Sequence, residues 1–151
     1  MIRNLGKLFL TLCLLAVGGV VANAQIDTLT QIQANVPFAF SVGDTTLPAG
    51  KYQIRTPYDN VPSVLELQSA NGRTRVLFET VDAQTRADQP ASKTELVFDK
   101  VGDQYFLSQV WEAGSASGSE LPKPRMEKRL ADGGSQSERH SIAAFIKRLK
   151  P

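Results

Sequence analysis

The chain has 151 residues, of which 42% are hydrophobic and 21% are charged, with 17 basic and 15 acidic side chains. This length suits a single domain that is large enough to bury a core of its own. With one cysteine and one histidine in the whole sequence, the usual zinc-binding sets and any disulfide within the chain are excluded.

Residues 1–24 have the order of a secretory signal peptide. Arg3 and Lys7 form a positively charged start. An apolar run from Leu8 to Val21 follows and ends at Ala22-Asn23-Ala24, a small-x-small cleavage site. The run is too short to span a bilayer comfortably. We therefore expect an exported protein, periplasmic or extracellular, with no stable transmembrane segment after processing.

The single cysteine, Cys13, lies inside the apolar run and is expected to be removed with the leader. The alternative is lipidation, as in bacterial lipoproteins, but Leu10-Thr11-Leu12 lacks the small residue that normally precedes a lipidated cysteine. Without Cys13 the mature chain has no thiol for disulfides or metal binding. The core alone must then stabilise the fold.

Charge is unevenly distributed in the mature chain. The leader holds two basic and no acidic residues, so 15 of each sign remain. Residues 25–120 carry seven basic and twelve acidic side chains, whereas residues 121–151 carry eight basic and three acidic ones. We expect this basic tail to lie on the acidic part of the chain; the alternative is a tail that binds anionic surfaces. Export argues against nucleic acid as a partner.

The clearest strand pattern covers residues 31–42. Large apolar side chains alternate with other residues from Ile32 to Val42, which places them on one face of a strand. Pro37 cannot donate a ladder hydrogen bond, so it predicts an edge or a bend. Leu47-Pro48-Ala49-Gly50 then predicts a tight turn before a second strand over Lys51–Thr56.

Asn71-Gly72 predicts the best hairpin of the chain, because this pair readily adopts the positive φ values of a type I′ turn. It joins strands expected at Ser63–Ser69 and Arg73–Thr80. A polar connection over residues 81–91 follows and is long for a plain loop. Two further strands are expected, at Ser92–Lys100 and Gln104–Trp111.

The composition changes after the β domain expected at residues 25–111. Residues 112–134 are expected to form a flexible linker and then a short charged segment of one or two helical turns. Residues 135–151 are expected to form a basic C-terminal helix. The helix prediction rests on apolar residues that share one helical face, namely Ile142, Phe145, Ile146 and Leu149.

The predicted fold class is therefore mainly β. We expect an antiparallel sandwich or small barrel of about six to eight strands, with a C-terminal helix. This choice follows from the two-residue alternation of the strands and from the turn residues between them.

No catalytic or metal-binding set is evident from the residue types. His140 is expected to be a solvated surface residue, and no motif provides it with a nucleophile. Asp99 and Asp103 flank a predicted turn. We expect them to be ordinary turn carboxylates; the alternative is that they bind calcium weakly. The acids expected on strands, such as Glu66 and Glu95, have no spacing that selects a pair for hydrolysis. The sequence predicts no catalytic residue, no metal site and no cofactor.

Four aromatic residues are the candidate ligand-binding groups: Tyr52, Tyr58, Tyr105 and Trp111. In one interpretation they line a groove and stack on sugars or other flat ligands. In the alternative, Tyr52, Tyr105 and Trp111 are core residues at strand positions.

Four stretches of sequence carry a recognisable pattern. Val36–Asp44 reads VPFAFSVGD, and Thr46–Tyr52 reads TLPAGKY. Later in the chain, Gly102–Trp111 reads GDQYFLSQVW, and Glu120-Leu121-Pro122 follows. This pattern resembles an uncharacterised family of small exported bacterial proteins, over most of residues 32–131. The resemblance implies export and a β-rich domain, and it supplies no activity or site residues.

Export, the lack of a catalytic set and the basic tail together predict a non-enzymatic envelope protein that binds a ligand or partner. An envelope polysaccharide, a lipid or a protein are the partners considered. Two alternatives stay open. A carboxylate-dependent hydrolase, with residues 81–91 as a lid, would place two acids in a concave pocket. A structural envelope or matrix protein would bind no soluble ligand.

Overall fold

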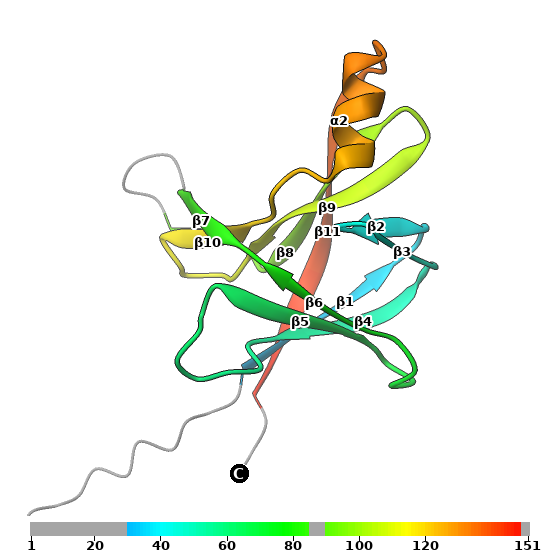
Figure 1. Cartoon of the computed structure of the whole chain (residues 1–151). Helices are drawn as coiled ribbons and strands as arrows, with labels where there is room; N and C mark the ends of the chain where they lie inside the picture. Colours follow the sequence, from blue (N-terminus) through cyan, green and yellow to red (C-terminus); the bar gives the residue numbers. More distant parts are fainter. Residues whose placement is uncertain (1–29, 85–89, 149–151) are drawn as a thin grey trace, which may run out of the picture.

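A computed structural model describes residues 30–84 and 90–148 of the chain. These residues form eleven strands and one helix, labelled in Figure 1. In chain order the elements are β1 (Thr30–Val36), β2 (Phe40–Val42), β3 (Thr45–Leu47), β4 (Gly50–Arg55), β5 (Val64–Ser69), β6 (Arg75–Glu79), β7 (Val81–Gln84), β8 (Glu95–Val101), β9 (Gln104–Trp111), β10 (Ser117–Glu120), α2 (Arg125–Asp132) and β11 (Ser137–Arg148). The leader expected at residues 1–24, with Cys13, lies outside the described residues.

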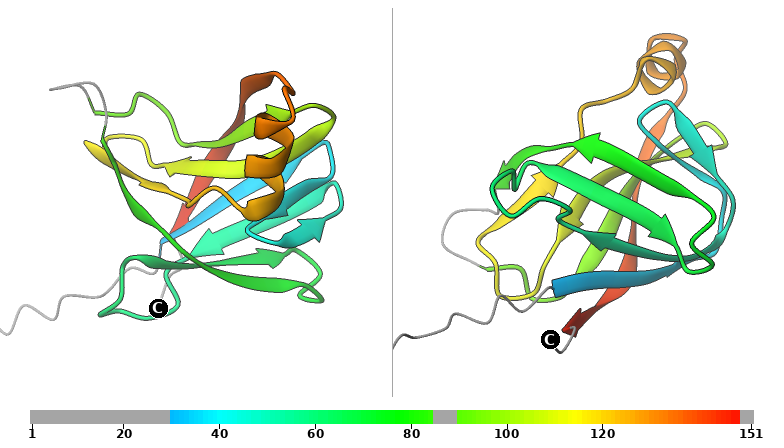
Figure 2. Two further views of the ribbon diagram at one scale, coloured as in Figure 1. Left: turned by 45° about the horizontal axis from the view of Figure 1, so that its top comes forward. Right: turned by 60° about the horizontal axis from the view of Figure 1, so that its bottom comes forward.

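The strands build one barrel-like sheet. Its main order is β3-β2-β9-β8-β11-β1-β4-β5-β6, and neighbours are antiparallel apart from the short contact of β2 with β9. β10 pairs with both β9 and β7. Only Thr80 separates β6 from β7, so the chain continues directly from β6, which pairs with β5, into β7, which pairs with β10. This connection nearly closes the barrel (Figures 1 and 2).

The mainly β, antiparallel fold expected from the sequence is confirmed, with more strands than expected. The sequence predicts six to eight strands, whereas the described residues form eleven. The strand expected at residues 31–42 is divided after Val36 into β1 and β2, at the bend that Pro37 predicts. β3, β7 and β10 have only three or four residues each, which is too few to show an alternating pattern.

The described part of residues 135–151 does not form the expected basic C-terminal helix. It contains β11, a twelve-residue strand that pairs with β8 and then with β1. It runs antiparallel to β1, from the pair of Ala144 with Ala34 to the pair of Arg148 with Thr30. The helix of the C-terminal part is α2, which falls on the short charged segment expected within residues 112–134.

Pairing along its whole length explains why β11 is a strand, since Ser137–Ala143 pair with β8 and Ala144–Arg148 pair with β1. Ile142 and Ile146 are four residues apart, so they fit one helical face and one strand face equally well. Ala144 completes the strand pattern, since it is buried while Ala143 and Phe145 are exposed. Hydrogen bonding to two neighbouring strands and burial of this face outweigh a local helical preference, which is weak.

The segment expected as a linker, residues 112–134, is partly built into the sheet. Within it, β10 pairs Ser119 with Val110 of β9 and with Asp82 of β7. β7 in turn is the beginning of the polar connection expected at residues 81–91. These pairings join segments far apart in the chain, so no local pattern announces them.

The barrel interior is filled by aromatic and branched side chains from most of the strands. Phe98 of β8 is fully buried, and its ring meets Phe38 and Phe40 edge to face at centroid separations of 5.2 and 5.3 Å. Tyr52 of β4 packs edge to face on Phe40 at 5.1 Å. Such pairs are favourable because the positive edge of one ring meets the negative face of another. They couple β4, β8 and the β1–β2 bend.

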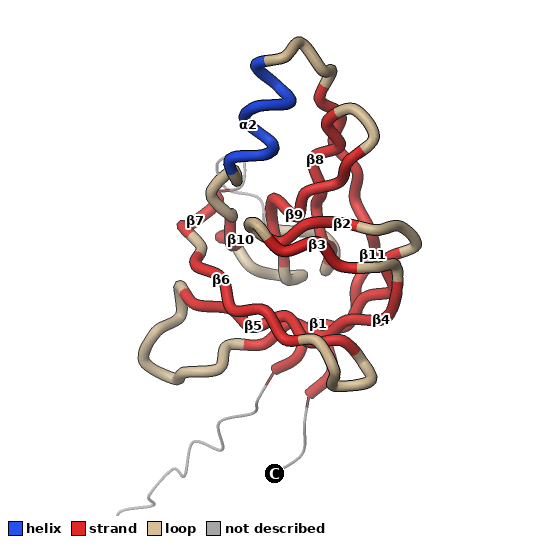
Figure 3. Tube along the Cα trace, turned by 45° about the vertical axis from the view of Figure 1, so that its right-hand side comes forward, coloured by secondary structure: helices blue, strands red, loops and turns tan. Residues whose placement is uncertain are grey.

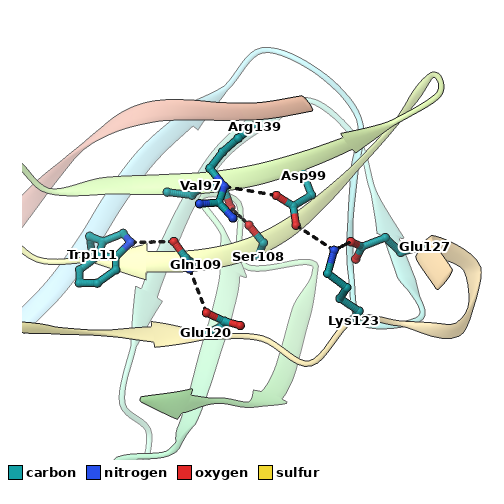
Figure 4. A network of polar contacts seen from close by, with 9 residues as sticks. All are labelled: Val97, Asp99, Ser108, Gln109, Trp111, Glu120, Lys123, Glu127 and Arg139. Carbon is teal, nitrogen blue, oxygen red and sulfur yellow. Dashed lines mark hydrogen bonds and ion pairs between the residues drawn. The ribbon is translucent and has the colours of Figure 1, made fainter. Parts of the chain in front are cut away.

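A charged cluster holds α2 against the outer face of β8, at one end of the barrel (Figures 3 and 4). Lys123 Nζ lies 2.8 Å from Glu127 Oε1 and 3.5 Å from Asp99 Oδ2. Arg139 Nε of β11 lies 3.6 Å from Asp99 Oδ1. Both carboxylates are buried, and buried charges require such partners. The hydrogen bond to Glu127 and the charges of Glu127 and Asp99 raise the pKa of Lys123.

Two neighbouring alanines test the strand assignment of β11. Ala144→Lys is expected to lower the free energy of unfolding by about 3 kcal/mol or more, because it buries an unpaired ammonium group. Ala143→Lys places its charge in water opposite Glu95, and a change below about 0.5 kcal/mol is expected. Urea denaturation followed by circular dichroism measures both variants. Equal losses of unfolding free energy in the two variants would contradict the alternation of buried and exposed residues along β11.

Candidate functional site

A cavity of about 270 Å³ lies between two groups of strands, with β1, β4 and β5 on one side and β9 and β10 on the other. Its apolar lining consists of Ile32, Ile54, Pro62, Leu65 and Val110. Pockets for small molecules are typically mostly apolar, with a few placed polar groups, and measure roughly 300 to 1,000 Å³. The cavity is therefore slightly smaller than this range.

Hydroxyl groups provide much of the polar lining, and the sheet register explains why they point inward. Ser119 of β10 is paired with Val110 of β9 and with Asp82 of β7. Directly paired residues of antiparallel strands point to the same face. All three residues line the cavity, as does Ser117, two positions along β10.

Three charged residues line the cavity, and their sum is negative. Arg55 is already engaged by Glu66, whose Oε1 lies 2.8 Å from Nη2 and 2.9 Å from Nε of Arg55. Glu66 is buried and also lies 3.4 Å from Arg75 Nε. Asp82 and Glu112 are exposed and have no ion-pair partner within the described residues. The uncompensated charge of the cavity is thus that of two carboxylates.

The four aromatic residues expected to form a ligand groove lie at separate places, and none of them lines this cavity. Tyr52 is buried in the core and donates a hydrogen bond of 2.6 Å to the carbonyl oxygen of Pro48. Tyr58 is exposed in the loop between β4 and β5. Tyr105 stacks on Phe38, with 3.8 Å between the ring centroids. The core interpretation therefore fits Tyr52, and Tyr105 packs at the margin of the core.

Trp111 lies next to the cavity wall. Its indole Nε1 donates to Gln109 Oε1 at 3.1 Å, and Gln109 Nε2 donates to Glu120 Oε2 at 2.9 Å (Figure 4). The ring packs on Gly118, where an added Cβ would lie 2.6 Å from Cε3 of the indole. Gly118 itself lines the cavity. Because Gly118 has no side chain, the indole of Trp111 can pack directly on the backbone of β10.

The remaining polar candidates of the sequence have other surroundings. His140 lies on β11, where its ring meets Tyr105 edge to face and its Nε2 is 3.5 Å from Glu138 Oε2. Asp99, considered as a weak calcium ligand, pairs with Lys123 and Arg139. Across residues 30–84 and 90–148, no group of three or more acidic, histidine or cysteine side chains is placed to hold a metal ion.

Sequence reasoning did not select Asp82 or Glu112. Asp82 falls in the expected polar connection, and Glu112 falls in the expected linker. Neither segment shows a motif, and both are rich in polar residues. The pairing of β10 with β7 and β9 brings them to one cavity, and this pairing could have been found only from the fold.

Comparison of the chain with protein-family models, with curated proteins and with solved structures finds no match. The resemblance to small exported bacterial proteins therefore stays a prediction. In the part of the chain that the structure describes, no helix has the length and apolar character needed to cross a membrane. The geometry of the cavity is the basis for a functional proposal.

Tyr52→Phe removes the hydroxyl that donates to Pro48, and it is expected to lower the free energy of unfolding by about 1 kcal/mol. Burial raises the pKa of Tyr52, so the folded chain holds this proton more tightly than the unfolded chain. The resulting stability is present at neutral pH and is lost as pH rises above about 10. As the pH is raised, the free energy of unfolding, measured by urea denaturation, should therefore fall less steeply for Tyr52→Phe than for the wild type. Tyr58→Phe is the control, and identical pH profiles for Tyr52→Phe and wild type would refute the assignment.

Gly118→Ala is expected to displace Trp111, since the new methyl group overlaps the indole ring. We expect a loss of about 1 to 3 kcal/mol in stability and a shift of the fluorescence emission maximum. Trp111 is the only tryptophan, so the signal is unambiguous. Ser119→Ala, the neighbouring residue, should leave the emission unchanged. An unshifted emission spectrum for Gly118→Ala would show that the indole of Trp111 does not pack on Gly118.

Proposed function

We propose that this chain is an exported, non-enzymatic binding protein, and that its cavity takes a small hydroxylated ligand with a positive charge. Apolar walls, serine hydroxyls and two uncompensated carboxylates in one cavity are the observation that supports this proposal. Export is supported by the order of charge, apolar run and small residues in the first 24 positions.

The lining favours a ligand with distinct apolar and polar sides. Ile54, Leu65 and Val110 offer contact to C–H groups, while Ser117 and Ser119 provide hydroxyls as donors and acceptors. A cationic group near Asp82 or Glu112 would form charge-assisted hydrogen bonds, which are stronger than neutral ones. A volume of about 270 Å³ suits a molecule of the size of one amino sugar.

Binding is favoured over hydrolysis by the exposure of the two acids. A carboxyl group that acts as a general acid is kept protonated by an apolar environment, and its partner is held in a defined geometry. Asp82 and Glu112 are both exposed to water. Such carboxylates are suited to attract and orient a cation.

The proposal is tested by isothermal titration calorimetry of the mature chain with glucosamine, and with glucose and N-acetylglucosamine as neutral counterparts. Glucosamine is expected to bind most tightly. Asp82→Asn and Glu112→Gln should each weaken its binding about fivefold to tenfold, the loss of one charge-assisted hydrogen bond. Asp44→Asn removes an exposed acid outside the cavity and should leave binding unchanged.

Each alternative predicts a different outcome of this experiment. A structural envelope protein would bind none of the three sugars, and that result would overturn the proposal. A carboxylate-dependent hydrolase would release product from a glycoside substrate and lose this activity in Asp82→Asn or Glu112→Gln. Binding that is equal for charged and neutral sugars would remove the role assigned to the carboxylates.

A further inference from the structure

The outer face of the sheet carries an aromatic ring that neither the core nor the cavity uses. Phe145 of β11 is 73% exposed, the highest value among the exposed large hydrophobic side chains of the described residues. Phe145 is paired with Gln33 of β1, whereas the pairing of β11 with β8 ends at Ala143, so the ring projects from the part of β11 that extends beyond β8. A ring in this position contributes little to folding, because most of its surface stays in water.

Beside this ring the surface is hollowed, with a volume of about 280 Å³. Phe145 forms one wall, and the neighbouring strands β1 and β4 supply most of the rest. Three amide side chains line the hollow: Gln33, Asn35 and Gln53. Lys51 is the one charged residue among those that line it. This surface is therefore nearly neutral and rich in hydrogen-bonding groups.

The amides form an ordered row that starts at the ring. Phe145 is paired with Gln33 of β1, Gln33 with Gln53 of β4, and Gln53 with Gln68 of β5. Gln53 Nε2 donates to Gln68 Oε1 at 2.8 Å, which fixes these two side chains. Gln33 and Asn35 make no side-chain hydrogen bond to the described part of the chain. Their amide groups are available to a ligand, each with two donors and an acceptor.

We infer that this hollow binds a neutral glycan chain. One face of a sugar ring presents C–H groups that stack on an aromatic ring, while its hydroxyls pair with amide donors and acceptors. Phe145 supplies the ring, and Gln33, Asn35 and Gln53 supply the amides within one hollow. The open, shallow surface of a sheet accommodates a chain that continues beyond the contacted sugar.

Other partners fit this surface less well. Binding to anionic lipid headgroups or acidic polymers requires several basic residues, whereas the hollow has Lys51 alone. Insertion into a lipid layer requires a broad apolar face, and here one ring is surrounded by amides. A protein interface typically has a larger apolar centre. The site shares no lining residue with the cavity proposed above, so the two proposals stand or fall separately.

The test uses cellohexaose, a neutral β-glucan oligomer, in isothermal titration calorimetry with the mature chain. Wild type should bind weakly. Phe145→Ala should reduce the affinity at least about tenfold, whereas Phe145→Trp should retain or improve it. Leu77→Ala is the matched control, since Leu77 is also an exposed apolar residue, on β6 and outside the hollow. Gln33→Ala should weaken binding severalfold.

Stability and oligomeric state are measured for the same variants. Because Phe145 is largely exposed, Phe145→Ala should unfold at the urea concentration of the wild type. Equal affinity of Phe145→Ala and wild type, or no binding of cellohexaose by wild type, would overturn the inference. A dimeric wild type that becomes monomeric in Phe145→Ala would instead assign the ring to contact with a second copy, and would also overturn it.

Discussion

The pairing of β11 with both β1 and β8 joins the two parts of the barrel. β1, β4 and β5 form one part and β8 and β9 the other, and β11 supplies hydrogen-bond partners to each. The same strand fixes the inner and outer faces. It buries Ala144 opposite Ala34, brings Arg139 to Asp99 and leaves Phe145 on the outside.

Each buried acidic side chain among the described residues has a cationic partner at the outer surface of the sheet. Glu66 lies beneath Arg55 and Arg75, and Asp99 lies between Lys123 and Arg139. Such pairs add little net stability, because desolvation offsets much of their attraction. Removing one partner is far more costly, since a buried charge then remains unpaired. These clusters therefore specify which segments cover which part of the sheet. Of the acids that line the cavity, Asp82 and Glu112 are both open to a ligand.

The parts of the fold that were predictable are those encoded by neighbouring residues. Asn71-Gly72 lies in the hairpin connection between β5 and β6, as predicted, and Gly72 has a positive φ of 71°. The turn is not the expected type I′ turn centred on this pair, because the amide of Gly72 donates to the carbonyl oxygen of Ser69 and makes Ala70 and Asn71 the central residues. Gly102, with φ of 61°, lies in the two-residue turn from β8 into β9. The bend at Pro37 follows from its missing amide hydrogen. Each of these features is determined within a few residues of sequence.

The parts that escaped prediction depend on pairing between distant segments. β11 was expected to be a helix because Ile142, Phe145 and Ile146 fit a helical face, while the small Ala144 hid the strand period. β10 was expected to be a linker because serine and glycine are common in linkers. Its place in the sheet is set by β7 and β9, and the cavity exists only because of it. The four aromatic candidates were chosen by residue type; none of them lines the cavity, whereas Tyr52 is among the residues that line the hollow beside Phe145.

The strand that joins the two parts is the last of the described strands to be synthesised. Thr30 meets Arg148 across the sheet, so the nascent protein cannot complete the pairing of β1 with β11 until the ribosome has passed Arg148. A topology of such high contact order folds slowly, because loop entropy is lost before the contacts form. Export belongs to the function proposed above, and under that proposal slow folding would keep the chain unfolded long enough to pass through a translocation channel.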